Sequence, residues 1–113
     1  MSGAEKNYEN AIKRFLKSEG IYPLGVSSKD ITVKPCGYYT KRHGNVFTTN
    51  GLPDLQVVVN GKCVDLEVKA ENGKPSEVQI AIVSQINDCG GIAHVVYPKD
   101  FDFIKSLILG LKK

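Results

Sequence analysis

Apolar residues recur at helical spacing near both ends of the chain. One stripe occupies residues 5–19 and stops at Gly20, and another follows Asp100, a suitable helix cap, over 101–111. A third helix is predicted from Ser76, as its N-cap, to about Asp88. The positions expected to face inward are Tyr8, Ala11, Ile12, Phe15 and Leu16 in the first helix, Val78, Ala81, Ile82 and Ile86 in the next, and Phe101, Ile104, Leu107, Ile108 and Leu111 in the last.

Strand patterns lie between these helices. Residues 31–34 predict a short strand, residues 36–50 a polar irregular loop, and residues 92–97 a buried strand. Residues 51–69 alternate in polarity around Asn60-Gly61, the pair preferred in two-residue hairpin turns because both positions need positive φ. Helix, strand, hairpin, helix, strand and helix in this order predict a single α/β domain over 1–113, with a mixed sheet flanked by helices.

The hairpin turn fixes which side chains meet. With a two-residue loop at 60–61, Asp54 lands opposite Glu67, and both share one face of the hairpin. That face also carries Gln56, Cys63, Asp65 and Lys69, while Leu55, Val57, Leu66 and Val68 fill the buried face. Opposed Cβ atoms lie roughly 5 Å apart, where two carboxylates repel. A bound divalent cation is therefore the expected reason for the pair.

Asp54 followed by Glu67-Val68-Lys69 on the next strand has the spacing of a metal-dependent phosphodiesterase site. Carboxylate oxygens suit a hard cation such as Mg²⁺, which acidifies water and neutralises charge on a phosphate. Lys69 lies about 7 Å beyond Glu67 on the same face, within reach of the attacking water or the phosphate. The alternative is that Glu-x-Lys marks a solvated strand face and Pro53-Asp54 a simple turn.

Composition restricts the class of protein. Of 113 residues, 42% are hydrophobic and 24% charged, which is typical of a globular domain, and the net charge of +3 permits a nucleic-acid partner without requiring one. Three widely spaced cysteines, Cys36, Cys63 and Cys89, argue against a disulfide framework and a zinc site, and favour a reducing compartment. Because the N-terminal residues lack the apolar core of a signal peptide, we expect a cytoplasmic protein.

Several short motifs together resemble a known family. They are Gly51-Leu-Pro-Asp54-Leu, Glu67-Val-Lys69 and Pro75-Ser-x-x-Gln79, with an opening Glu5-Lys-x-Tyr8-Glu9-x-x-Ile12, Lys41-x-His43-Gly44, and Gly90-Gly-x-Ala93 before the last strand. In order and spacing they resemble the virus-type replication-repair nuclease domain, VRR-NUC, of the PD-(D/E)XK superfamily. The likeness is to its stand-alone phage-type members. It implies a restriction-endonuclease-like αβββαβ core.

The resemblance also implies roles for individual residues. Asp54, Glu67 and the Val68 carbonyl would bind Mg²⁺, for which Mn²⁺ substitutes, and Lys69 would assist the water. A glutamate of the first helix would complete the centre, and Glu9 fits the pattern of related junction resolvases better than Glu5. The alternative for Glu9 is an exposed i,i+4 pair with Lys13.

Other residues keep two interpretations. Gln79 either faces the active site, as the resemblance implies, or closes a capping box with Ser76. Lys41, Arg42 and His43 either bind DNA phosphates or form a solvated basic loop. One of Tyr38 and Tyr39 is expected in the core, and Cys63 as a small apolar filler. Leu107, Leu109 and Leu111 suit an exposed patch at a dimer interface or a partner surface.

The function expected from these features is metal-dependent DNA endonuclease activity. Resemblance to resolvases implies a homodimer that cuts branched DNA such as Holliday junctions, in the cytoplasm of a phage host if the chain is phage-encoded. The alternatives are a non-catalytic nucleic-acid-binding module and a structural or inhibitory protein that reuses the fold. The presence of Asp54, Glu67 and Lys69 together speaks against the module.

Overall fold

The hairpin predicted at the centre of the chain is present in the computed structural model, which describes residues 3–42 and 51–113. Strands β3 (Leu55–Val59) and β4 (Lys62–Val68) pair antiparallel, with Val57 opposite Val64. The turn residues Asn60 and Gly61 have φ values of 50° and 78°, as the tight turn requires. The predicted register is confirmed.

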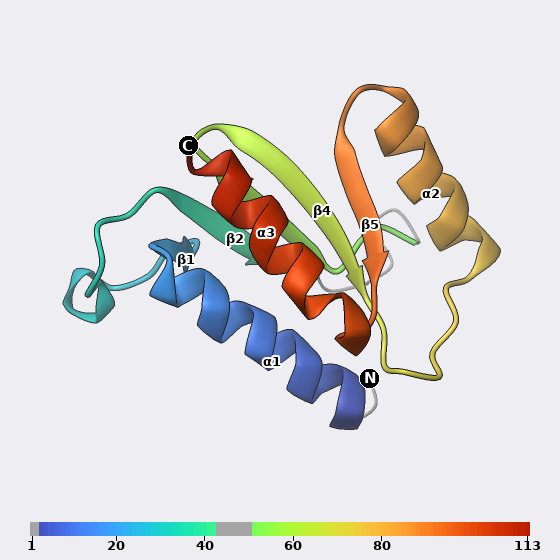
Figure 1. The fold of residues 1–113 in the computed structure, drawn as a ribbon, viewed down its shortest axis with the longest axis horizontal. Coiled ribbons are helices and arrows are strands. Elements are labelled where there is room, and N and C mark those ends of the chain that lie inside the picture. The colour runs from blue at the N-terminus through green and yellow to red at the C-terminus, as the bar shows by residue number, and fades with distance from the viewer. Residues whose placement is uncertain (1–2, 43–50) are drawn as a thin grey trace.

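The hairpin forms the middle of a five-stranded sheet in the order β1-β2-β3-β4-β5 (Figure 1). On one side, β2 (Gly37–Lys41) pairs antiparallel with β3, and β1 (Ile21–Pro23) pairs parallel with β2. On the other side, β5 (Ile92–Val96) runs parallel to β4 after a helical crossover. The sheet is mixed, as the element order predicted.

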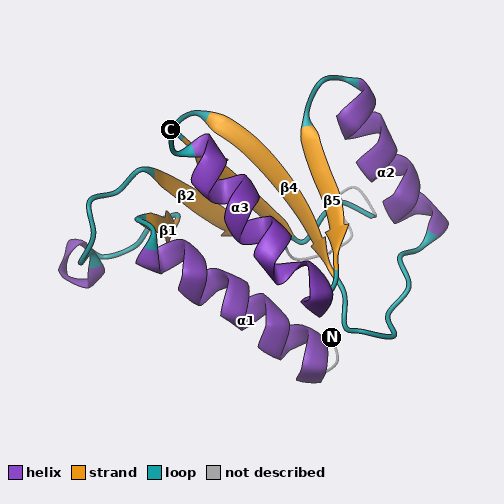
Figure 2. Ribbon diagram, in the orientation of Figure 1, coloured by secondary structure: helices purple, strands orange, loops and turns teal. Residues whose placement is uncertain are grey.

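Two helices cover one face of this sheet (Figure 2). They are α1 (Gly3–Ser18) and α3 (Phe101–Leu111), whereas α2 (Glu77–Asp88) packs beside β5 at the edge of the sheet. The core between α1, α3 and the sheet includes Ile12, Leu16, Leu55, Val57, Leu66, Val68, Ile104 and Ile108. The predicted apolar face of the hairpin is therefore the buried one. None of the helices in the described ranges is long and apolar enough to cross a membrane.

The first half of the chain differs from the sequence prediction. Residues 31–34 form no strand, because the hydroxyl of Tyr22 accepts from the N–H groups of Thr32 and Val33 at 3.0 and 2.9 Å. That side chain takes the hydrogen bonds that a neighbouring strand would supply. Residues 37–41 were expected in a loop and instead form β2, in which Tyr39 is buried and Tyr38 is exposed.

Helix α2 is less buried than its apolar pattern predicts. Val78 is 46% exposed and Ala81 is also exposed, while Ile82 and Ile86 are half-buried. The helix is held to β5 by a side-chain amide, since Asn87 exchanges two hydrogen bonds of 2.9 Å with the backbone of Ala93. Edge packing thus covers only part of the helix.

The last helix begins where predicted, at Phe101 with Asp100 as its N-cap, but its capping and packing differ from the prediction. A short 3₁₀ helix, Pro98–Asp100, precedes α3, and the Asp100 carboxylate accepts from the Tyr97 N–H instead of from the helix it was expected to cap. Leu109 is exposed, whereas Leu107 and Leu111 pack against the core, so the predicted leucine patch is reduced to one residue. Cys63 is exposed and fills no core space.

Candidate active site

The two acids of the hairpin meet at one end of β3 and β4. Asp54 directly precedes β3, and its Oδ2 accepts from the Val68 N–H at 2.9 Å, which fixes the side chain against β4. Glu67 is 2% exposed and lies on the same face. Its Oε1 is buried without a hydrogen-bond partner in the structure. A buried carboxylate oxygen without a partner is costly, so the pair is stable only with a shared proton or a bound cation.

The pKa of Glu67 also reflects its burial next to a second carboxylate. Burial, and after it the neighbouring Asp54 carboxylate, raise the pKa of Glu67 to about 8, while Lys69 acts in the opposite direction. Two carboxylates that share a site hold one proton between them until the pH is high. A cation that binds both oxygens would take the place of that proton.

Lys69 stands beside this pair. Its Nζ lies 3.4 Å from Glu67 Oε2, and its side chain is 14% exposed. The Lys69 N–H donates to the Val96 carbonyl at 3.0 Å, which extends the β4–β5 pairing by one residue and fixes the base of the side chain. A positive group thus lies beside Glu67, and the pKa of Glu67 stays raised in spite of it.

Glu9 of α1 joins the site through a lysine. The Lys41 ammonium, at the end of β2, lies 2.6 Å from Glu9 Oε1 and 3.6 Å from Asp54 Oδ1. Glu9 also pairs with Lys13 at 2.9 Å, but it is 3% exposed, so this is not the exposed pair of the alternative interpretation. Burial alone would raise the pKa of Glu9, but hydrogen bonds from Lys41 and Lys13 outweigh it and hold the pKa below its usual range.

Of the predicted basic residues, Lys41 and Arg42 pair with different acids. Lys41 points into the acidic site, and Arg42 donates to the Pro53 carbonyl at 3.0 Å and pairs with Asp65 at 2.9 Å. His43 lies outside the described residues. Sequence reasoning missed the contact between Lys41 and the acids, because it assigned residues 36–50 to a loop. The run Tyr38-Tyr39-Thr40, rich in strand-forming residues, was the available signal.

Gln79 forms the capping box at the start of α2. Its Oε1 accepts from the Ser76 N–H at 2.8 Å, and the Ser76 hydroxyl accepts from the Gln79 N–H at 3.1 Å. The helix-capping interpretation is confirmed. A role for Gln79 in the site, like that of the Val68 carbonyl, stays a prediction.

The donor set suits a hard cation in part. Residues 3–42 and 51–113 contain no group of three or more His, Cys, Asp or Glu side chains arranged to hold a metal. Asp54 and Glu67 supply oxygen ligands and one unpartnered buried acceptor, which fits a cation such as Mg²⁺. The third carboxylate, Glu9, is tied to Lys41. The described site is therefore a two-carboxylate centre with a lysine beside it.

Comparison with known proteins adds no relative. No protein-family model matches the chain, and no curated protein sequence matches it.

Proposed function

We propose that the protein is a Mg²⁺- or Mn²⁺-dependent endodeoxyribonuclease with a PD-(D/E)XK, VRR-NUC-like core. The observation that carries the proposal is the opposed pair Asp54 and Glu67 with the Lys69 ammonium 3.4 Å from Glu67. Three groups that are individually common on strands converge at one strand end. The antiparallel β2-β3-β4 unit followed by α2 and β5 is compatible with the proposed core.

Each side chain has a task in phosphodiester hydrolysis. When bound, the metal supplies an acidified water and neutralises charge on the phosphate. Asp54 and Glu67 hold it, with the Val68 carbonyl as a further ligand, and Lys69 orients the water or contacts the phosphate. Glu9 positions Lys41 and so sets the charge next to Asp54. Gln79, at the start of α2, is proposed to turn toward the same face when substrate binds.

The proposed substrate is branched DNA, such as a four-way junction, cut by a homodimer. This part rests on the resemblance to stand-alone nucleases and resolvases and on the mild positive charge of +3. Shape is then the property that is recognised, and two subunits would supply two cuts. The proposed place of action is the cytoplasm.

The test incubates the protein with labelled four-way junction, flap and linear duplex, each with Mg²⁺, with Mn²⁺ or with EDTA. Metal-dependent cleavage is expected, with the junction preferred over the duplex. If none of the three substrates is cleaved with either metal, the enzyme proposal is wrong.

A second function, a non-catalytic nucleic-acid-binding module, is favoured by one observation. The Lys41 ammonium already lies between Glu9 and Asp54, so part of the acidic charge is neutralised within the protein. Calorimetric titration with Mn²⁺ separates the two functions. A nuclease binds Mn²⁺ and loses that binding in Asp54→Asn. The module does not depend on the metal, so its affinity for DNA, measured separately, should be the same with and without Mn²⁺.

A further inference from the structure

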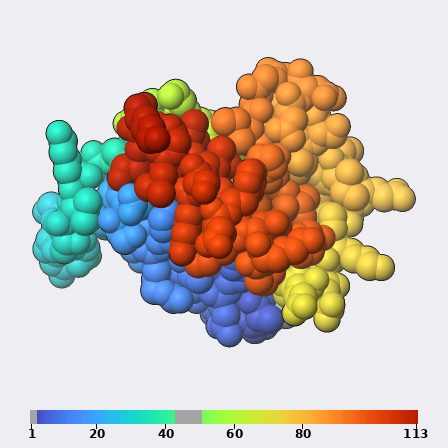
Figure 3. Space-filling view, in the orientation of Figure 1, coloured from blue at the N-terminus to red at the C-terminus, as the bar shows by residue number. Residues whose placement is uncertain are grey.

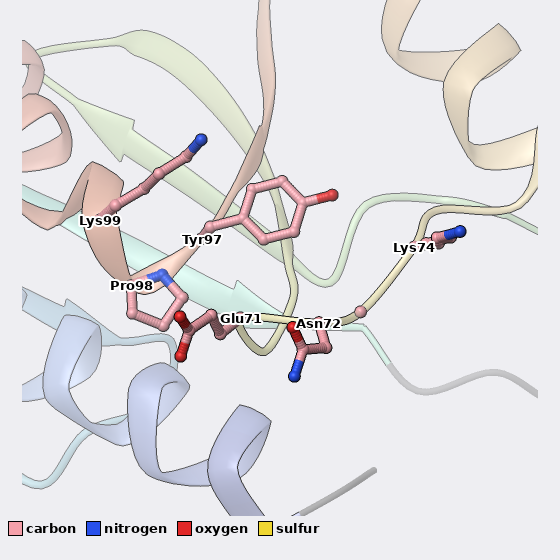
Figure 4. Close-up of a pocket in the computed structure, with 7 residues that line it drawn as sticks. Glu71, Asn72, Lys74, Tyr97, Pro98 and Lys99 are labelled. Atoms are coloured by element: carbon pink, nitrogen blue, oxygen red, sulfur yellow. The ribbon is translucent and has the colours of Figure 1, made fainter.

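A surface cavity of about 950 Å³ adjoins the candidate active site. It lies between the turn that follows β4 and the residues that follow β5 (Figure 4). We call it the Tyr97 cavity; its lining residues are Glu71, Asn72, Gly73, Lys74, Tyr97, Pro98 and Lys99. In the space-filling view of Figure 3, the turn (yellow) and the segment that leads into α3 (orange-red) lie on the same face of the molecule. None of these residues takes part in the chemistry assigned above.

Two contacts connect the cavity to Lys69. The turn folds back on this residue, so that a Cβ built on Gly73 would lie 3.4 Å from the Lys69 Cβ. On the opposite wall, the Lys69 N–H donates to the carbonyl of Val96, the residue before Tyr97. Lys69 therefore lies next to the wall of the cavity, and a polymer with one phosphate at Lys69 can extend its neighbouring unit into it.

Tyr97 lines this cavity from a backbone position that is held in place. The Tyr97 N–H donates to Asp100 Oδ2 at 2.9 Å, and the Asp100 N–H donates back to the Tyr97 carbonyl at 2.8 Å. Pro98 restricts the next backbone angle. The backbone that carries the half-buried ring is therefore held by a local turn, which lowers the cost of ordering the ring when a planar ligand stacks on it.

The charges around the ring favour an anion. Lys99 lies with its Nζ 5.8 Å from the centre of the Tyr97 ring, and Lys74 lies in the wall formed by the turn. Both lysines are exposed and outnumber the single acid, Glu71. In Figure 4 the Glu71 carboxylate and the Tyr97 hydroxyl point in opposite directions. An aromatic ring with one lysine beside it and a second lysine in the same cavity matches a base with its flanking phosphates.

We propose that the Tyr97 cavity binds one unpaired nucleotide of the DNA strand, next to the phosphate held at Lys69. The base stacks on Tyr97, and Lys74 and Lys99 contact the phosphates on either side of it. A base within a duplex is stacked on both faces, so this site selects DNA with unpaired nucleotides. The inference rests on the proposed function and gives that function a structural source of preference for flaps and junctions.

The direct test uses 2-aminopurine, a base whose fluorescence falls when it stacks. Flap DNA with this base at successive unpaired positions is mixed with the protein in EDTA, so that binding is measured without cleavage. Quenching is expected at one position near the branch, in the wild type and in Tyr97→Phe. Tyr97→Ala should lose it and bind flap DNA about tenfold more weakly. The matched control is Tyr38→Ala, which removes an exposed tyrosine on another strand.

The lysines are tested by the salt dependence of the same binding. Lys74→Ala and Lys99→Ala should each lower the slope of log K against log salt by roughly 0.7, the value for one lost single-strand phosphate contact. Lys29→Ala, in the short helix Ser28–Asp30, serves as control for an exposed lysine elsewhere. Glu71→Gln should tighten binding, because it removes the one acid of the cavity wall. If Tyr97→Ala does not fold, these slopes still decide the proposal.

The outcomes separate this inference from the nuclease proposal. Quenching that persists in Tyr97→Ala, or slopes unchanged in both lysine variants, overturns the cavity proposal even if the wild type cleaves DNA. Quenching that depends on Tyr97 supports the cavity as a DNA site even if no metal supports cleavage, and in that case the nuclease proposal alone fails.

Discussion

Glu67→Gln should make the protein more stable at alkaline pH and leave its stability nearly unchanged in acid. The folded state raises the pKa of Glu67 from 4.5 to about 8, chiefly through burial and through Asp54. Between these values the native protein holds a proton that the unfolded chain has lost. The stability that this proton contributes is fully present below about pH 4.5 and is lost as the pH rises through 8. Glutamine has the same shape and cannot ionise, so the variant loses this dependence.

The magnitude follows from the size of the shift. Each unit corresponds to about 1.4 kcal/mol, so a shift from 4.5 to about 8 sets a ceiling of about 5 kcal/mol. Asp54 is 22% exposed at its side chain, and solvent there reduces the repulsion. We therefore expect the free energy of unfolding of Glu67→Gln to exceed that of the wild type by about 2–3 kcal/mol at pH 8.5 and by under 1 kcal/mol at pH 4.5.

The assay is urea unfolding of both proteins in EDTA at several values between pH 4.5 and 8.5. Taking the difference between variant and wild type at each pH cancels other titrating groups, including Glu9. Glu71→Gln, which neutralises an exposed carboxylate, is the matched control. Adding Mg²⁺ at pH 8.5 should stabilise the wild type more than Glu67→Gln, because the cation replaces the lost proton.

A difference that stays constant across the pH range would refute the reasoning, because it would mean that Glu67 does not titrate as a buried acid beside Asp54. A difference that shrinks with rising pH would be opposite to the predicted trend and would refute the reasoning equally. If the metal stabilised both proteins alike, Glu67 would not be one of its ligands.

Three further substitutions and one control test other parts of the structure. Lys69→Ala should abolish cleavage and leave DNA binding within about threefold, measured by gel assay and fluorescence anisotropy; cleavage at the wild-type rate would remove Lys69 from its proposed role. Lys41→Met should cost about 1–3 kcal/mol in EDTA, because Glu9 loses its 2.6 Å partner, yet Mn²⁺ should stabilise this variant more than the wild type. A smaller metal effect would contradict competition between lysine and metal. Gly37→Ala should cost about 3 kcal/mol or more in urea unfolding, since its Cβ would lie 2.1 Å from the Val58 carbonyl oxygen, whereas Gly110→Ala, with open space around it, should be neutral or stabilising.

Local rules predicted the hairpin and most of the helices. The turn at Asn60-Gly61 fixes the register of β3 and β4 by itself, because only a few residue pairs accept two successive positive φ values. From that register, alternation alone places Asp54, Glu67 and Lys69 on one face. The capping box of α2 was equally predictable from the sequence, since Ser76 and Gln79 are three residues apart and form hydrogen bonds within one helical turn.

Elements that depend on a distant partner were missed. Strand β2 was assigned to a loop, because the polar residues around Tyr38-Tyr39-Thr40 masked that short strand signal, and pairing with β1 and β3 decides the outcome. The converse error occurred at residues 31–34, whose β-branched residues favour a strand but bond to the hydroxyl of Tyr22, about ten residues earlier. A side chain that replaces a strand leaves no signal in local periodicity.

The sequence by itself thus determined the carboxylate pair and the lysine beside it, because a two-residue turn and strand alternation act over fewer than twenty residues. Only the tertiary structure decided what surrounds them. It brings Glu9 of α1 within 2.6 Å of Lys41, 32 residues away, and it sets the Tyr97 cavity against Lys69 through the pairing of β4 with β5. Contacts of this kind follow from how helices pack on a sheet, and no local pattern specifies their partners.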